Sequence, residues 1–235
     1  NIPHQKDLTM NFIFDNRFRS INRAYRALTT HTQYLGNANN TVTFNQGRNR
    51  WGPIHTYKIY GEGGNDRITF SSNTKNYVWA GEGNDTVYGG SGRDLIYGGN
   101  GNDVVFGRDG DDLLIGNHGN DVLNGGNGND VLSGREAADT LVGGGGSDHF
   151  YVGHDASMDS VSDFQDRGDK VTVHNFGRFD ITQNKQFIRI FDTSNNMTAQ
   201  LNTRRSPIDF SIQQRGSQAT FTIIDDDNGG LPNLV

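Results

Sequence analysis

Apolar and polar positions follow a nine-residue period through the middle of the chain, between residues 61 and 151. In each block the eighth residue is apolar, whereas the first six are mainly glycine, asparagine, aspartate and other turn formers. The pattern predicts a six-residue turn followed by a three-residue strand with one inward side chain. The predicted inward residues are Ile68, Val78, Val87, Ile96, Val105, Leu114, Leu123, Leu132, Leu141 and Phe150.

The blocks share the consensus Gly-Gly-x-Gly-x-Asp-x-apolar-x. Recognisable copies begin at residues 61, 80, 89, 98, 107, 116, 125, 134 and 143. A worn copy at 71–79 has Asn76 in place of the aspartate and follows one extra residue, Phe70. Self-similarity at a short fixed period is typical of a solenoid, in which each repeat stacks on its neighbours.

One inward position per nine residues predicts a flat coil with two turns and two short strands in each winding. A winding then takes 18 residues, and alternate aspartates stack along opposite edges. We expect Asp85, Asp103, Asp121 and Asp139 on one edge, continuing from Asp66, and Asp94, Asp112, Asp130 and Asp148 on the other.

Such rows of carboxylates predict a metal-binding function. At one strand spacing, about 4.8 Å, neighbouring carboxylates repel by roughly 1 kcal/mol even in water. Ca²⁺ removes this repulsion and prefers the carboxylate and backbone oxygens that the turns offer, whereas Mg²⁺ demands a tighter octahedral geometry. The predicted sites are 85/103, 103/121, 121/139, 94/112, 112/130 and 130/148, with a seventh possible between Asp66 and Asp85.

The glycines of the turns are predicted to shape these sites with their backbone. Glycine at positions one, two and four permits positive φ and close approach, and Asn at position five also tolerates the left-handed region. The substitutions Arg108 and Arg135 are expected to be tolerated, whereas Ala137 makes the sites that use Asp139 doubtful. The predicted turn glycines are Gly81, Gly83, Gly90, Gly92, Gly99, Gly101, Gly110, Gly119, Gly126 and Gly128.

The nonapeptide resembles the RTX repeat of hemolysin-type calcium-binding proteins, strongly over 61–151 and with a continuation in 159–173, "DSVSDFQDRGDKVTV". This resemblance implies a right-handed parallel β-roll, export by a bacterial type I secretion system, and folding in extracellular Ca²⁺. The partners that it implies are calcium and the secretion machinery. Localisation outside a bacterial cell follows from the same resemblance.

Composition supports a folding switch. The chain has 32 glycines among 235 residues and only 32% hydrophobic residues. It has no cysteine and therefore no disulfide. It also contains no run of about 18 apolar residues that could span a membrane. Residues 61–151 carry 14 acidic against 5 basic residues. One apolar side chain per nonapeptide contributes about 1.5–3 kcal/mol against a backbone entropy of about 1–2 kcal/mol per residue. We therefore expect the repeats to be largely disordered without Ca²⁺.

The flanks differ from the array. Residues 1–60 carry 8 basic against 2 acidic residues and include a predicted amphipathic helix at 16–28, with Phe18, Ile21, Tyr25 and Leu28 on its apolar face. This helix is either a cap on the first winding or a contact for a polyanion or a membrane surface. Residues 152–235 predict a β-rich cap with an export signal possible in the tail. The expected organisation is thus 1–60, 61–151 and 152–235.

Outward aromatic residues of one predicted face, Tyr77, Trp79 and Tyr97, form a possible ligand-contact surface or the packing site of a flanking segment. The chain has no HExxH, GxSxG or P-loop motif, although His149, His154 and Asp155 are a possible metal set. The favoured function is a secreted, non-catalytic calcium-binding module of an exoprotein. The alternatives are an adhesin that binds polysaccharide or a cell surface, and a small enzyme with an unrecognised site. We expect no nucleic-acid partner.

Overall fold

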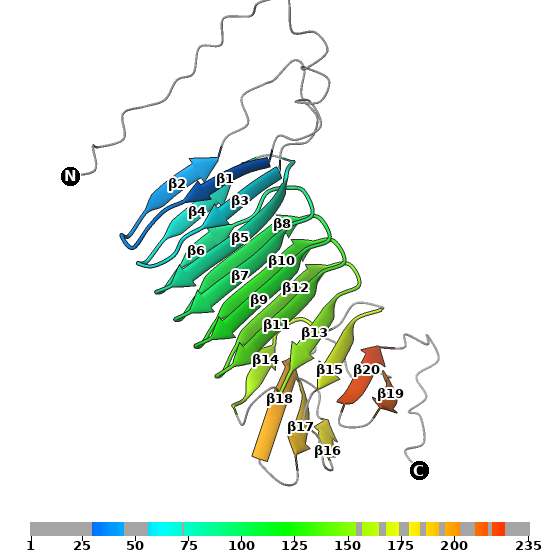
Figure 1. The fold of residues 1–235 in the computed structure, drawn as a ribbon. Helices are drawn as coiled ribbons and strands as arrows, with labels where there is room; N and C mark the ends of the chain where they lie inside the picture. Colours follow the sequence, from blue (N-terminus) through cyan, green and yellow to red (C-terminus); the bar gives the residue numbers. More distant parts are fainter. Residues whose placement is uncertain are drawn as a thin grey trace, which may run out of the picture.

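The computed structural model describes residues 30–44, 56–71, 73–153, 157–164, 168–173, 179–183, 187–192, 196–202, 210–215 and 218–223. Within these residues the fold is all-β, and two sheets of parallel strands form a flattened solenoid (Figure 1). No helix in the described part is long and apolar enough to cross a membrane. The helix predicted at 16–28 and the proposed tail signal lie outside the described residues.

From β1 to β15 the chain alternates between the two sheets, so that odd-numbered strands build one sheet and even-numbered strands the other. The first sheet contains β1 (Thr30–Tyr34), β3 (Thr56–Tyr60), β5 (Lys75–Glu82), β7 (Leu95–Asn100), β9 (Leu113–His118), β11 (Val131–Glu136), β13 (His149–Val152) and β15 (Lys170–Val173) in this order. The second contains β2 (Thr41–Phe44), β4 (Arg67–Phe70), β6 (Thr86–Tyr88), β8 (Val104–Asp109), β10 (Val122–Asn127), β12 (Thr140–Gly145) and β14 (Asp159–Val161).

Strand register confirms the 18-residue winding in the array. Leu95 pairs with Leu113, and Val104 pairs with Val122. The parallel windings extend beyond the nonapeptides on both sides, where the spacing changes because the connecting loops are longer. Thr30 pairs with Thr56 at one end, and His149 pairs with Lys170 at the other.

The strands are longer than the three residues that the sequence pattern predicts. In most windings they contain six residues, as in β8, so the first glycines of each repeat belong to a strand. Glycine lowers strand propensity, but here its N–H and C=O groups continue the ladder between windings, as in the pairing of Gly81 with Gly99. The turn itself is correspondingly short.

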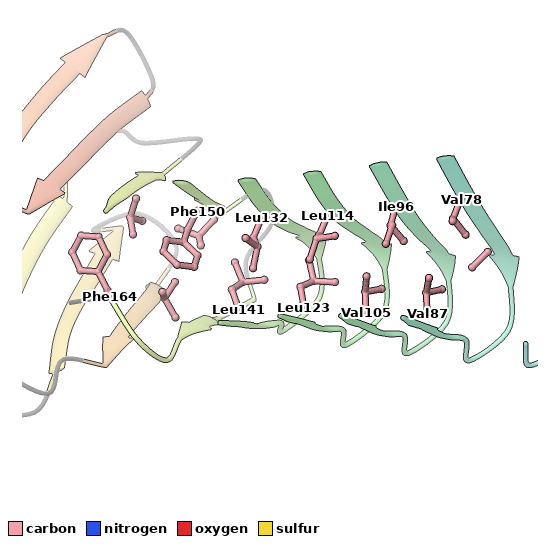
Figure 2. Close-up of a cluster of buried hydrophobic side chains, with 14 of the residues drawn as sticks. Val78, Val87, Ile96, Val105, Leu114, Leu123, Leu132, Leu141, Phe150 and Phe164 are labelled. Carbon is pink, nitrogen blue, oxygen red and sulfur yellow. The ribbon is translucent and has the colours of Figure 1, made fainter. Parts of the chain in front are cut away.

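The core is a double row of apolar side chains from the eighth position of each repeat, facing one another between the sheets (Figure 2). All ten predicted inward residues are fully buried, which confirms the prediction. Phe164 closes one end of these rows and contacts Phe150 edge-on at 6.5 Å. The sheets therefore enclose a thin apolar interior, and the turns lie at the two edges of the roll.

Further strands follow the parallel windings. β18 (Asn196–Asn202) pairs with β14 in parallel, and β17 (Phe187–Asp192) and β16 (Phe179–Gln183) follow it in antiparallel order. On the other sheet β20 (Gln218–Ile223) pairs antiparallel with β15 and with β19 (Phe210–Arg215).

Candidate metal centre

The predicted aspartates lie at the two edges of the roll, each immediately before a strand. They form two rows, which we call the first edge (Asp66, Asp85, Asp103, Asp121, Asp139) and the second edge (Asp94, Asp112, Asp130, Asp148). Every one of these side chains is only 1–2% exposed. Carboxylates are rarely buried to this extent without a compensating partner, so their hydrogen bonds decide what the edges can do.

One oxygen of each carboxylate belongs to a ladder that joins successive windings. The backbone N–H of Asp85 donates to Oδ1 of Asp103 at 2.8 Å, and the N–H of Asp103 donates to Oδ1 of Asp121 at 2.8 Å. On the second edge the N–H of Asp94 donates to Oδ1 of Asp112 at 2.7 Å. Through these bonds the carboxylate of each aspartate holds the backbone of the neighbouring winding.

The second carboxylate oxygen, Oδ2, has no hydrogen-bond donor at most of these aspartates. The Oδ2 atoms are buried and accept no hydrogen bond from the described residues at Asp66, Asp85, Asp103, Asp112, Asp121 and Asp130. A buried acceptor without a donor costs about 1–3 kcal/mol, and more when it is charged. A row of such atoms indicates a ligand that the protein chain itself does not provide.

Glycine stands at position one of most repeats, Ala80 being an exception, and leaves space beside this oxygen. A Cβ atom on Gly98 would overlap Oδ2 of Asp103 and approach the carbonyl oxygen of Gly116 in the next winding to 2.9 Å. A Cβ atom on Gly107 would likewise meet Oδ2 of Asp112 and the carbonyl oxygen of Gly125. Carboxylate and carbonyl oxygens therefore converge where a side chain would otherwise stand.

The donor set consists of oxygen atoms. Among the described residues no three His, Cys, Asp or Glu side chains lie close enough to hold a metal ion by themselves. Backbone carbonyls must then supply the remaining ligands, which suits Ca²⁺ with its six to eight oxygens in flexible geometry. The residues present thus fit calcium in donor type, in burial and in the unsatisfied oxygen.

The electrostatics of the metal-free roll oppose ionisation of these groups. Burial, followed by repulsion from Asp94 and Asp130, raises the pKa of Asp112 to about 8. Burial also raises the pKa of Asp85, Asp121 and Asp148 to about 7, and that of Asp94, Asp103 and Asp130 to about 6. Near neutral pH these carboxylates need positive charge nearby to ionise without penalty.

Most predicted turn glycines adopt the backbone conformation that requires them. Gly81, Gly83, Gly99, Gly101, Gly110, Gly119, Gly126 and Gly128 all have φ between 109° and 141°. Gly90 and Gly92 lie outside the left-handed region, so the turn of that winding is built differently. Arg108, Arg135 and Ala137 have positive φ, which shows that the turn tolerates these side chains in its usual conformation.

Asparagine at position five acts differently from the prediction. Asn84, Asn102 and Asn120 do not have positive φ; instead their side chains form an exposed second ladder. The N–H of Asn102 donates to Oδ1 of Asn84 at 2.7 Å, and the N–H of Asn120 donates to Oδ1 of Asn102 at 2.8 Å. Asparagine is thus suited to this position because its amide oxygen reaches the next winding.

The aspartate ladder includes residues that the nonapeptide alignment missed. The N–H of Asn40 donates to Oδ1 of Asp66 at 2.8 Å, and buried Asp159 and Asp169 accept N–H bonds from Asp139 and Asp148. Each stands in an Asp/Asn-x-apolar triplet, "NTV", "DSV" or "DKV", which is the end of the consensus. That triplet, searched without the nine-residue spacing, is the signal that finds them.

The predicted contact surface is a stack of rings on the outer side of the first sheet. Trp79 lies parallel to Tyr60 with a centroid distance of 4.8 Å and to Tyr97 at 6.0 Å, while Tyr34 stacks on Tyr60 at 4.9 Å. Tyr77 lies 6.4 Å from Trp79. Since the rings cover one another's faces, the stack stabilises successive windings.

The possible histidine site is not assembled in the described part of the chain. His149 stacks on Tyr151 with a centroid distance of 4.3 Å, and its Nε2 lies 2.7 Å from Oγ1 of Thr172. His154 and Asp155 lie outside the described residues. His149 is therefore accounted for by contacts within its own sheet.

Comparison with known families agrees with the geometry. Residues 58–150 match the RTX calcium-binding nonapeptide repeat in several overlapping segments. No curated protein matches the chain. The chain therefore carries RTX calcium-binding nonapeptide repeats, and these repeats form a parallel β-solenoid.

Proposed function

We propose that the solenoid is a calcium-dependent structural module in which both aspartate edges bind metal ions between successive windings. The row of buried Oδ2 atoms, most of which face a glycine at position one of the repeat, is the observation that carries this proposal. The carboxylates contribute charge, and the carbonyls of the turns contribute neutral oxygens. A bound calcium ion supplies the positive charge that the described side chains do not bring to these atoms.

Metal binding is proposed to act as a folding switch. The core holds one fully buried apolar side chain per nonapeptide, and the other side chain buried in nearly every repeat is an aspartate. Ionised Asp112 faces Asp94 and Asp130 along the same edge, and burial already disfavours its charge. Metal ions compensate these charges only in the rolled state. The free energy of metal binding therefore stabilises the folded solenoid relative to the unfolded chain.

The proposed setting is outside the cell. Ca²⁺ sites in extracellular modules bind at about 10⁻⁴–10⁻³ M, so a chain that needs such concentrations to roll would stay extended before export. Right-handed coiling, type I secretion, a bacterial origin and a place within a larger exoprotein belong to this proposal through the family resemblance. The structural evidence for polysaccharide binding is weaker, because the aromatic faces that would stack on sugars are already in contact with each other.

Equilibrium dialysis tests the binding proposal. The chain should bind about five or six Ca²⁺ ions, and should retain them in excess Mg²⁺, because oxygen-rich turns with backbone carbonyls do not offer Mg²⁺ its small octahedral site. Binding of no more than one ion, or equal displacement by Mg²⁺, would contradict the proposal.

A further inference from the structure

The winding that contains Asp94 differs from the others on the second edge. Its turn glycines, Gly90 and Gly92, lie outside the left-handed region, and the preceding strand β6 has three residues where β8 has six. This changed backbone turns the N–H of Gly90 toward the carboxylate, and it donates to Oδ2 of Asp94 at 2.9 Å. The oxygen left unsatisfied at Asp112 and Asp130 is thus already occupied at Asp94.

Asn76 supplies further donors at the same place. It stands where the preceding winding would have an aspartate, and its Nδ2 donates to Oδ1 of Asp94 at 2.8 Å, beside its backbone N–H at 2.8 Å. The same Nδ2 also donates to the carbonyl of Thr74 at 3.3 Å. An amide here replaces carboxylate–carboxylate repulsion with attraction.

Arg108 reaches back into these first windings. Its Nη1 donates to the carbonyl oxygens of Phe70 at 2.9 Å and Gly89 at 3.2 Å. By strand register Phe70, Gly89, Gly107 and Gly125 take the same place in successive windings. Farther along this row the carbonyl of Gly125 converges with Oδ2 of Asp112. The member of this row beside Oδ2 of Asp94 is the carbonyl of Gly107. The guanidinium therefore binds the two carbonyls of the row that precede the one beside Asp94.

We propose that N–H donors from Asn76, Gly90 and Arg108 close the first winding of the second edge in place of a metal ion. The second edge of that winding takes up no calcium, and this closed edge keeps the winding rolled when calcium is absent. It then forms a template on which the calcium-dependent windings assemble toward the C-terminal side. Arg108 is the positioning residue that makes this end of the roll independent of metal.

The surroundings of Arg108 support this role. Its guanidinium carbon lies 5.1 Å from the ring centroid of Tyr88, which stacks on Phe106 at 5.0 Å and also has Arg67 over it at 4.7 Å. The Tyr60–Trp79–Tyr97 stack lies on the other sheet of the same windings. Stacked aromatic and cation–π pairs add stability that needs no metal, and they gather where the aspartate edge begins.

Arg135 provides a matched control. It holds the same motif position as Arg108 and has nearly the same backbone angle, φ 83° against 82°. Arg135 is exposed and makes no side-chain hydrogen bond with the other described residues. Glycine is the usual residue at this position, as at Gly99 and Gly126, and a non-glycine residue at positive φ is strained. Relief of strain alone would therefore make Arg108→Gly and Arg135→Gly equally neutral or stabilising.

The test is hydrogen exchange measured by mass spectrometry on the full chain, with and without Ca²⁺, for the wild type, Arg108→Gly and Arg135→Gly. In EGTA we expect wild-type protection in residues 75–109 and little in 110–150. Arg108→Gly should lose about tenfold or more of the protection in 75–109, whereas Arg135→Gly should not. Arg108→Lys keeps the positive charge but loses the planar guanidinium with its several N–H donors. Its protection of residues 75–109 should lie between those of the wild type and Arg108→Gly.

Two results would overturn the proposal: no protection of 75–109 in wild-type protein without metal, or equal behaviour of Arg108→Gly and Arg135→Gly. The inference uses the proposed calcium function only for the windings beyond residue 109. If Ca²⁺ added no protection to 110–150 in the wild type, the calcium proposal would fail. The contrast between the two arginine variants in EGTA would still decide the role of Arg108.

Discussion

Replacement of Asp112 by asparagine should have opposite effects in the presence and absence of calcium. Without metal, asparagine removes a buried charge between Asp94 and Asp130, and its amide can occupy the place of Oδ2 and donate to the nearby carbonyl of Gly125. Asn76 shows that the ladder accepts an asparagine at an aspartate position, where its Nδ2 donates to a carboxylate and to a backbone carbonyl. With calcium, the same change removes an anionic ligand.

The magnitude follows from the shifted pKa. The pKa of Asp112 rises from 3.8 to about 8, so at pH 7 the rolled state resists an ionisation that the unfolded chain has completed. At about 1.4 kcal/mol per pH unit between 3.8 and 7, the penalty has an upper limit of about 4 kcal/mol. Solvent screening at the edge of the roll reduces the expected gain from Asp112→Asn to about 1–3 kcal/mol.

Two titrations followed by far-ultraviolet circular dichroism measure both effects. In EGTA a stabilising osmolyte drives folding without metal, and Asp112→Asn should need less of it than the wild type. In a Ca²⁺ titration the variant should need more calcium, by about tenfold for one weakened site.

The control is Asp111→Asn, which changes the net charge equally. Asp111 is exposed, and its Oδ1 accepts the N–H of Asn129 at 2.9 Å, a bond that asparagine can preserve. The osmolyte and Ca²⁺ midpoints of Asp111→Asn should stay close to those of the wild type. A higher osmolyte midpoint for Asp112→Asn than for the wild type in EGTA, or Ca²⁺ binding as tight as that of Asp111→Asn, would contradict this prediction.

Three further predictions follow from the same geometry. Because the pKa values of the buried aspartates are raised from 3.8 to about 6–8, the metal-free roll should lose stability as pH rises through that window. Osmolyte midpoints in EGTA should therefore be lower at pH 5 than at pH 8, and an unchanged midpoint would contradict the raised pKa values. Leu114→Ala empties a fully buried core position and should cost about 2–5 kcal/mol in urea unfolding with saturating Ca²⁺; a loss below about 1 kcal/mol would indicate that the rows in Figure 2 are not packed as described. Gly128→Ala places a Cβ against the carbonyl of Gly110 at φ 141° and should reduce stability by about 2 kcal/mol or more, whereas Gly145→Ala, which has room for a methyl group, should unfold within about 1 kcal/mol of the wild type.

The sequence predicts the periodic part of this molecule well, because each winding repeats the same local requirements. One apolar side chain and one aspartate per nonapeptide define the two core rows and the two edges, and strand register confirms both. The spacing fails where loops vary. β1 and β2 belong to the roll but pair 26 residues away, as Asn40 does with Asp66.

Several details of the candidate site depend on atoms rather than on residue types. The division of labour between Oδ1, which bonds to the neighbouring winding, and Oδ2, which remains unsatisfied, needs the backbone path of the turns. The sequence also does not reveal the altered turn at Gly90. Its residues "GGSGRD" match the consensus, yet the backbone N–H of Gly90 donates to Asp94. The bonds of Arg108 join residues 38 positions apart, a distance that no local pattern encodes.

The most direct measurement is a Ca²⁺ titration of the full chain followed by far-ultraviolet circular dichroism, with Mg²⁺ as the control. We expect a partial β signal in EGTA from the first windings, and a cooperative rise to the full signal at near-millimolar Ca²⁺, with no such rise in Mg²⁺. A full β signal in EGTA that Ca²⁺ leaves unchanged would contradict it, because the aspartate edges would then be stable without a cation.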